Sequence, residues 1–266
     1  MKNLVVAGGT AGMGLGLARH YLREGAHVTV IGRDAEKGRR FLGEAGERGA
    51  FIQADLTVVA ENKRVIEEVK ARHASLDGLV NTAMRHFSRR VETVDGFEGT
   101  FSLYYVSRFV LAYGLTELLE KGTDPVIVNV GGVGVTKGRI PWDDLSLKQG
   151  YSGIKAVLQA GRATDLLGVA YAANHVGGRT RYLLHHPGFT DSGSDSLAQP
   201  VKTIVKVLAR FFAQPVEKSI QPIIELMDTP GAGGLLAYDR RDPVDLSLST
   251  LDPAARRLYE LTEHVL

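Results

Sequence analysis

The stretch LVVAGGTAGMG, at residues 4–14, decides the fold. Its first residues are apolar and suit a buried strand, its second half is rich in glycine, and a helical pattern follows. A helix N-terminus offers free N–H groups and a positive dipole end to a pyrophosphate. Gly8 would permit a tight turn, and Gly12 and Gly14 would let the backbone approach the phosphates. The stretch therefore predicts a dinucleotide site, and the alternative is an ordinary glycine-rich turn.

Apolar runs alternate with helical patterns along most of the chain. The predicted strands are 4–7, 28–31, 51–52, 76–81, 126–130 and 180–185, and the predicted helices are 15–30, 35–48, 58–73, 97–120 and 151–173. Further on we expect helices near 200–213 and 216–228, an apolar run at 234–238 and a polar helix from Pro253. Alternation of this kind indicates parallel β-α-β units. We expect an α/β fold, a Rossmann-like doubly wound parallel sheet, in a single domain over 1–266 with the substrate-pocket segment at about 188–230.

The composition limits the kinds of partner that we expect for this protein. The 266 residues are 44% hydrophobic and 23% charged, and the net charge of +2 gives no reason to expect nucleic acid. No cysteine is present, which excludes disulfides and thiolate metal sites and suits a cytoplasmic protein. No apolar run approaches the roughly 20 residues that cross a bilayer, and the first residues run straight into a predicted strand. We therefore expect no membrane partner, no signal peptide and no metal.

Tyr151 and Lys155 form a second pattern with chemical meaning. On a helix, a spacing of four residues places both side chains on one face, about one turn apart. The lysine charge would then lower the tyrosine pKa from about 10. Such a tyrosine can exchange a proton with a carbonyl or alcohol while a nicotinamide exchanges the hydride. The alternative is a surface tyrosine beside a solvated lysine.

Several motifs together resemble the short-chain dehydrogenase/reductase family over nearly the whole chain. They are the glycine loop, Asp55, Asn81-Thr82-Ala83, Tyr151-x3-Lys155 and Pro187-Gly188. The segment VDGFE at 94–98 and the tail after Gln214 are similar to the retinol-dehydrogenase-like branch. The predicted cofactor-binding residues are Gly8, Thr10, Gly12, Met13, Gly14, Arg33, Asp55, Leu56, Asn81, Ala83, Tyr151, Lys155, Pro187, Gly188 and Ser192.

The resemblance implies a role for several of these residues. Asp55 would accept a hydrogen bond from the adenine amino group, although an aspartate before a helix is often only an N-cap. Asn81 would hold adjacent strands together, and Ala83 would pass beside the cofactor ribose. The segment at 187–192 would line the nicotinamide, with the Ser192 hydroxyl meeting its carboxamide. In that last role Thr190 is the alternative.

The end of the second predicted strand bears on the choice of cofactor. An NAD enzyme usually has an acidic residue there, which bonds to the ribose hydroxyls. This chain has Gly32, followed by Arg33, whose guanidinium can hold a 2′-phosphate. We therefore favour NADP(H) over NAD(H). Ala11 stands where NADP-dependent relatives often have a second basic residue, and the alternative for Arg33 is a solvated charge.

Two reaction positions depart from the family pattern. The family uses an asparagine, a serine, a tyrosine and a lysine, and the resemblance places Tyr104 at the asparagine position and Gly132 at the serine position. Loss of one polarising hydroxyl typically costs on the order of 100- to 1,000-fold in rate. Tyr104, Ser152 or Thr136 could supply another hydroxyl.

We expect an NADP(H)-dependent oxidoreductase, a ketoreductase that acts on a carbonyl or alcohol of an apolar small molecule. Its catalytic residues would be Tyr151 and Lys155. The alternative is a non-redox protein of the same fold, such as a cyclase, isomerase or cofactor-binding sensor. The predicted helices at 97–120 and 151–173 also carry many apolar residues, which favours a homo-oligomer. These apolar residues are Leu111, Leu115, Leu118, Val157, Leu158 and Leu166.

Overall fold

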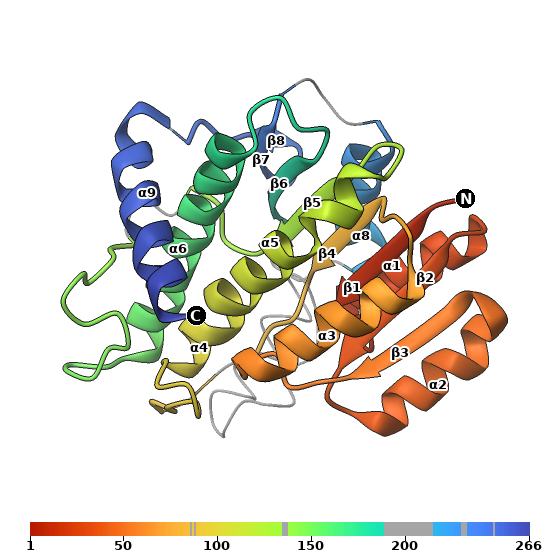
Figure 1. The fold of residues 1–266 in the computed structure, drawn as a ribbon, viewed down its shortest axis with the longest axis horizontal. Coiled ribbons are helices and arrows are strands. Elements are labelled where there is room, and N and C mark those ends of the chain that lie inside the picture. The colour runs from red at the N-terminus through yellow and green to blue at the C-terminus, as the bar shows by residue number, and fades with distance from the viewer. Residues whose placement is uncertain (86, 88, 135–137, 189–214, 230–232, 247) are drawn as a thin grey trace.

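One eight-stranded sheet forms the centre of the protein (Figure 1). The structure is a computed structural model of residues 1–266, and it describes all of them except 86, 88, 135–137, 189–214, 230–232 and 247. The strand order is β3-β2-β1-β4-β5-β6-β7-β8, with β8 antiparallel to β7 and the other neighbouring pairs parallel. This is the predicted α/β, doubly wound, mainly parallel sheet.

The described strands are β1 (Asn3–Ala7), β2 (His27–Gly32), β3 (Gly49–Gln53), β4 (Gly78–Asn81), β5 (Val126–Val130), β6 (Arg181–His186), β7 (Leu235–Asp239) and β8 (Asp242–Pro243). The described helices are α1 (Gly12–Arg23), α2 (Ala35–Ala45), α3 (Val59–Arg72), α4 (Gly99–Phe101), α5 (Ser107–Glu120), α6 (Gly153–Asn174), α8 (Val216–Asp228) and α9 (Leu248–Val265). A short 3-10 helix, η1 (Gly46–Arg48), follows α2, and a π-helix, η2 (Ser102–Val106), joins α4 to α5.

Helices cover both faces of the sheet. The side chains of β1 alternate between the faces, so that Val5 packs with α3, α5, α6 and α9, whereas Val6 packs with α1, α2 and α8. In Figure 1, α9 lies along α6 and α3 lies beside α5. Because both faces are buried, the central strands are continuous runs of valine, leucine and isoleucine rather than alternating sequences.

The helix boundaries differ from prediction where a glycine or a cap intervenes. The first helix, α1, ends at Arg23 rather than at residue 30, because Gly25 has a φ of 85° and β2 begins at His27. The predicted helix at 97–120 consists of α4, η2 and α5 in succession. The last helix begins at Leu248, before Pro253, and the apolar run near 234–238 is strand β7.

Most of the apolar residues on which the predicted homo-oligomer rests are buried within the single chain. Leu111, Leu115, Leu118 and Leu166 are buried in one hydrophobic cluster, partly because α9 packs on α6. Val157 is the most exposed of the predicted set, at 46%. The homo-oligomer stays a prediction without support from the buried leucines.

The sheet reverses its strand order between β1 and β4. From β1 the chain proceeds to β2 and β3 on one side, and then crosses to β4 on the other. Ligands of open α/β sheets bind at such a switch point, beyond the carboxyl ends of the strands. Buried polar side chains tie the second half together there: Asn81 of β4 donates to Asn129 Oδ1 at 2.8 Å, and Asn129 donates to the Tyr182 hydroxyl at 2.6 Å.

Candidate active site

The glycine loop forms a cradle that larger residues would fill. Gly8 has a φ of 82°, and a Cβ there would lie 2.6 Å from the backbone nitrogen of Ala83. A Cβ on Gly14 would lie 2.4 Å from both the Gly8 carbonyl oxygen and Thr82 Oγ1. Helix α1 begins at Gly12, and its N-cap, Ala11, provides no side-chain cap. The close packing and the uncapped N–H groups fit a pyrophosphate on the N-terminus of α1.

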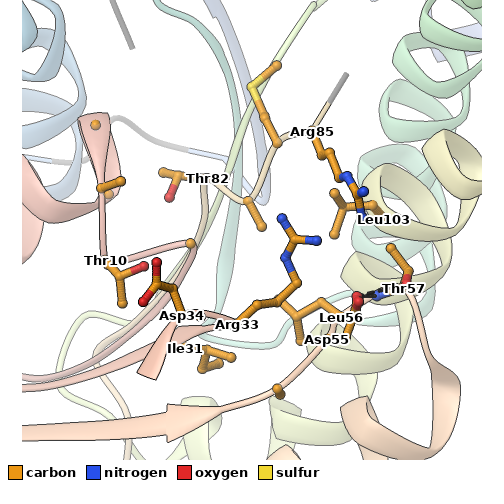
Figure 2. Close-up of a pocket in the computed structure, with 18 of the residues that line it drawn as sticks. Thr10, Ile31, Arg33, Asp34, Asp55, Leu56, Thr57, Thr82, Arg85 and Leu103 are labelled. Atoms are coloured by element: carbon orange, nitrogen blue, oxygen red, sulfur yellow. Dashed lines mark hydrogen bonds between the residues drawn. The ribbon is translucent and has the colours of Figure 1, made fainter. Parts of the chain in front are cut away.

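A cavity of about 580 Å³ extends from this cradle across the carboxyl ends of β1, β2 and β4 (Figure 2). The predicted cofactor residues that line it are Gly8, Thr10, Gly12, Met13, Gly14, Arg33, Asp55, Leu56 and Ala83. Asn81 is buried and does not line it, and neither do Tyr151, Lys155, Pro187 and Gly188. Pro187 and Gly188 follow β6 at the same edge of the sheet, whereas Ser192 lies outside the described residues.

Basic side chains gather beyond the end of β2. Arg33 and Lys37 both line the cavity, and neither forms an ion pair with a described residue, although the charge of Lys37 contributes to the lowered pKa of Asp34. Figure 2 shows Arg33 and Arg85 reaching into the same space, Arg85 from the loop after β4. A Cβ on Gly32 would lie 2.7 Å from Thr10 Oγ1, so an acidic residue at this strand end would require Thr10 to move. This end of the cavity therefore contains several cationic side chains.

An acidic group stands beside these cations. Asp34 is the N-cap of α2, and its Oδ1 accepts from the backbone N–H of Glu36 at 3.0 Å and of Lys37 at 3.1 Å. These backbone bonds, that of Lys37 above all, lower the pKa of Asp34. Asp34 also lines the cavity, so this end of it carries a carboxylate as well as the cations.

Asp55 stabilises its own turn rather than the next helix. Its Oδ1 accepts from the Thr57 N–H at 2.9 Å and from the Thr57 hydroxyl at 2.7 Å. The N–H of Val59, at the start of α3, instead donates to Asp95 Oδ2 at 2.8 Å. The N-cap interpretation of Asp55 is therefore wrong. Its bond to adenine remains a prediction, supported by its place in the cavity wall.

The structure corrects the predicted geometry of Tyr151 and Lys155. The hydroxyl of Ser152 accepts from the Lys155 N–H at 3.2 Å, so α6 begins at Gly153 and Tyr151 precedes the helix. The Tyr151 hydroxyl donates to the Phe87 carbonyl at 3.3 Å, and Lys155 Nζ donates to the Gly150 carbonyl at 2.9 Å. Burial, with the charge of Glu98, raises the pKa of Tyr151, which is opposite to the expected direction.

Tyr104, at the predicted asparagine position, does line the cavity. It lies in the π-helix η2, a distortion that is frequent at functional sites. Its hydroxyl donates to the Arg85 carbonyl and accepts from the Arg85 N–H, each at 3.1 Å. The neighbouring Arg108 is not among the predicted site residues, and its guanidinium carbon lies 5.6 Å from the centre of the Tyr104 ring.

The other predicted features are distributed as follows. The described part of the substrate-pocket segment, α8, packs against α1 rather than along the cavity, and 189–214 lie outside the described residues. Thr136 also lies outside them. Within the described residues, no helix is long and apolar enough to cross a bilayer, and no cluster of acidic, histidine or cysteine side chains is arranged around a metal position.

Comparison with known proteins identifies relatives along most of the chain. Polyprenol dehydrogenase of Danio rerio is 28% identical over 263 residues, which cover 93% of this chain and 81% of that protein. A candidate daunorubicin C-13 ketoreductase, DnrU, of Streptomyces sp. (strain C5) is 30% identical over 197 residues, which cover 68% and 67%. Retinol dehydrogenase 14 of Homo sapiens is 26% identical over 289 residues, which cover 98% and 85%.

Solved structures share the fold. An uncharacterised protein from Mycobacterium paratuberculosis has a TM-score of 0.76 at 22% identity, with 99% of this chain and 94% of that chain covered. An NADPH-bound carbonyl reductase from chicken fatty liver has a TM-score of 0.68 at 17% identity, with 92% and 98% covered. The family described as short chain dehydrogenase matches residues 2–155. The chain therefore belongs to the short-chain dehydrogenase/reductase family.

Proposed function

We propose that this protein is an NADP(H)-dependent ketoreductase that acts on a carbonyl or alcohol of an apolar small molecule, with an atypical active site. The observation that carries the proposal is the joint geometry of the glycine cradle and the cations Arg33 and Lys37, which form no ion pair with a described residue. The cradle suits a pyrophosphate, and the unpaired cations suit a further phosphate on the same ligand.

Different residues around the cavity would bind different parts of the cofactor. The N–H groups at the start of α1 would hold the pyrophosphate, Arg33 and Lys37 the 2′-phosphate, and Asp55 the adenine amino group. When bound, the cofactor supplies the hydride. Its placement would bring the reacting end toward Gly188, which lies at the same edge of the sheet as the glycine cradle.

Tyr151 and Lys155 remain the proposed catalytic pair. Tyr151 would donate its phenolic proton to the substrate oxygen during reduction and take it back during oxidation. For this, its hydroxyl must exchange the Phe87 carbonyl for the substrate, and Lys155 Nζ must leave the Gly150 carbonyl. Both present bonds are to backbone oxygens at partly exposed positions, so water or ligand can replace them.

The names of two relatives, a polyprenol dehydrogenase and a candidate C-13 ketoreductase, support a substrate with an alcohol or carbonyl group. The absence of cysteine is consistent with the proposed cytoplasmic location. We also propose that residues 1–266 form a single domain, with the substrate segment near 188–230, and that the protein is a homo-oligomer.

A non-redox protein of the same fold is the second candidate. It is favoured by the present arrangement of Tyr151 and Lys155, whose polar atoms bond to backbone carbonyls and do not line the cofactor cavity. Such a protein would bind the cofactor without oxidising or reducing it.

Two experiments test the ketoreductase proposal. Thermal unfolding with NADPH or NADH compares the cofactors, and a ligand at 100 times its Kd adds about 2.7 kcal/mol of stability. Greater stabilisation by NADH would contradict the NADP(H) assignment. NADPH absorbance is then followed with aromatic and polycyclic ketones. A substrate that is converted while NADPH stays reduced would favour the non-redox candidate.

A further inference from the structure

The proposed reaction needs a hydrogen-bond donor that the family normally supplies through serine. At that position this chain has Gly132. Of the hydroxyls that could replace the serine, Ser152 is already used as the cap of α6, and its hydroxyl bonds to the Lys155 N–H at 3.2 Å. Tyr104 is different, because it lines the cofactor cavity together with Thr82 and Ala83.

We propose that the Tyr104 hydroxyl donates the hydrogen bond that polarises the substrate carbonyl, and that Arg108 positions and strengthens this donor. The inference rests on the proposed ketoreductase function. Tyr151 keeps the role of proton donor. Tyr104 keeps its own proton throughout, so its contribution is an electrostatic one to the developing oxyanion.

The Tyr104 hydroxyl is loosely held. Its two bonds, both 3.1 Å long, go to the backbone of one exposed residue, Arg85, and the bond that the hydroxyl donates is longer than usual for an O–H donor. The rest of the side chain is fixed, because the ring packs against the main hydrophobic cluster and its backbone carbonyl accepts from Thr164 Oγ1 at 3.0 Å. A fixed ring with an exchangeable hydroxyl is what a donor to substrate requires.

Tyr104 lies in the π-helix Ser102–Val106, a distortion that is frequent at functional sites. Leu103 and Tyr104 both line the cavity, while the next residue, Tyr105, is buried and bonds to Thr262 Oγ1 at 2.8 Å. A cavity tyrosine and a core tyrosine are therefore neighbours in this turn.

Arg108 is a buried cation beside this donor. It is 3% exposed, forms no ion pair with a described residue, and donates through Nη2 to the Val130 carbonyl at 2.9 Å. A Cβ on Gly131 would lie 3.5 Å from its Nη1, which places the guanidinium at the end of β5, next to the vacant serine position. A positive charge near the phenol stabilises negative charge on its oxygen and so makes the hydroxyl a stronger hydrogen-bond donor.

The remaining groups around Tyr104 act in both directions. Burial raises the pKa of Tyr104 most, Glu98 also raises it, and the Arg85 N–H and the charge of Arg108 lower it. The phenol therefore keeps its proton at neutral pH, as a donor must. In the sequence, the Tyr104-x3-Arg108 spacing also repeats that of Tyr151-x3-Lys155.

The test is a double-mutant cycle with Tyr104→Phe and Gly132→Ser, assayed with NADPH and phenanthrenequinone. Tyr104→Phe should lower kcat by about 100-fold and change the Kd for NADPH by less than about twofold. Gly132→Ser should restore most of that rate in the Tyr104→Phe protein, because a serine hydroxyl again meets the carbonyl. Tyr113→Phe, which removes a hydroxyl from α5 outside the cavity, is the matched control and should be neutral.

A second readout does not depend on turnover. Ultraviolet difference titration of tyrosinate, compared between the parent and Tyr104→Phe, isolates the ionisation of Tyr104. Arg108→Met should move that ionisation to higher pH, and Arg108→Lys should move it less. If Arg108→Met does not fold, Arg108→Lys still tests whether the Tyr104 ionisation moves to higher pH.

The outcomes separate the two levels of the proposal. A Tyr104→Phe protein that reduces the quinone at the parent rate would overturn the role of Tyr104 alone. Failure of Gly132→Ser to recover any rate would do the same, and an unchanged Tyr104 titration in both Arg108 variants would overturn the role of Arg108. A parent protein that binds NADPH but reduces no ketone would overturn the ketoreductase proposal and this inference together.

Discussion

Replacing Arg33 with serine should convert a phosphate-specific site into one that distinguishes poorly between the two cofactors. Arg33 lines the cavity, and its guanidinium has no described partner to release before it binds a phosphate. A hydrogen bond between charged groups contributes about 1.5–3 kcal/mol, and about 1.4 kcal/mol corresponds to a tenfold change in affinity. Since the side chain is exposed and Lys37 remains, we expect the lower part of that range, a loss of about tenfold for NADPH.

The NADH affinity should change by less than about threefold, because NADH lacks the 2′-phosphate. Arg40→Ser is the matched control: it removes the same charge from α2 at an exposed position that does not line the cavity. Isothermal titration calorimetry at two salt concentrations measures both affinities and the screening of the charge. An equal loss for both cofactors, or no loss for NADPH, would refute this assignment of Arg33.

Other changes test the cradle, the buried polar chain and the pH response. Gly14→Ala should abolish measurable NADPH binding because its Cβ would lie 2.4 Å from Gly8 O, whereas Gly43→Ala, with nothing within 4 Å of its Cβ, should bind normally; calorimetry compares the two. Tyr182→Phe should lower the free energy of unfolding by about 1–3 kcal/mol in urea titrations, since the buried Asn129 Nδ2 loses its acceptor. Burial lowers the pKa of His185 to about 4, below its unfolded value of about 6.5, so the unfolded chain takes up this proton first as the pH falls. The free energy of unfolding should therefore drop between about pH 6.5 and 4, by up to about 3 kcal/mol from this residue, and His185→Gln should flatten that drop.

The sequence patterns predicted the sheet well because they depend on local chemistry. Apolar runs of valine and isoleucine marked the central strands, and the glycine loop after β1 marked the switch point. The end of α1 was misplaced, because Gly25 stops the helix while the apolar pattern continues through Ala26 into β2. A single left-handed residue therefore decided a boundary that hydrophobic periodicity could not.

The cofactor cavity was predicted from its own motifs, but most of the charged side chains that line it were not. Arg33 was expected there, whereas Lys37, Asp34 and Arg85 were not, since their convergence depends on how two separate loops meet. The first turn of α2 carried a usable signal, because Lys37 lies one helical turn beyond Asp34, the cap residue.

The geometry at the reaction positions could not be predicted from the sequence. The spacing of Tyr151 and Lys155 predicts one helical face, but Ser152 caps α6 between them and leaves Tyr151 outside the helix. The π-helix at Tyr104 was also invisible, because an extra residue in a turn leaves no mark in the apolar pattern. Both features arise from backbone hydrogen bonding rather than from residue type.

Transfer of deuterium from NADPH to a product carbon is the most direct test of the central claim, that this protein reduces a carbonyl with NADPH. The protein would be incubated with NADPH deuterated at the reactive position of the nicotinamide and with each ketone of the panel, and the products analysed by mass spectrometry. We expect an alcohol with one deuterium on the former carbonyl carbon, formed in equal amount to the oxidised cofactor. A product that forms without deuterium while the labelled NADPH stays reduced would contradict it.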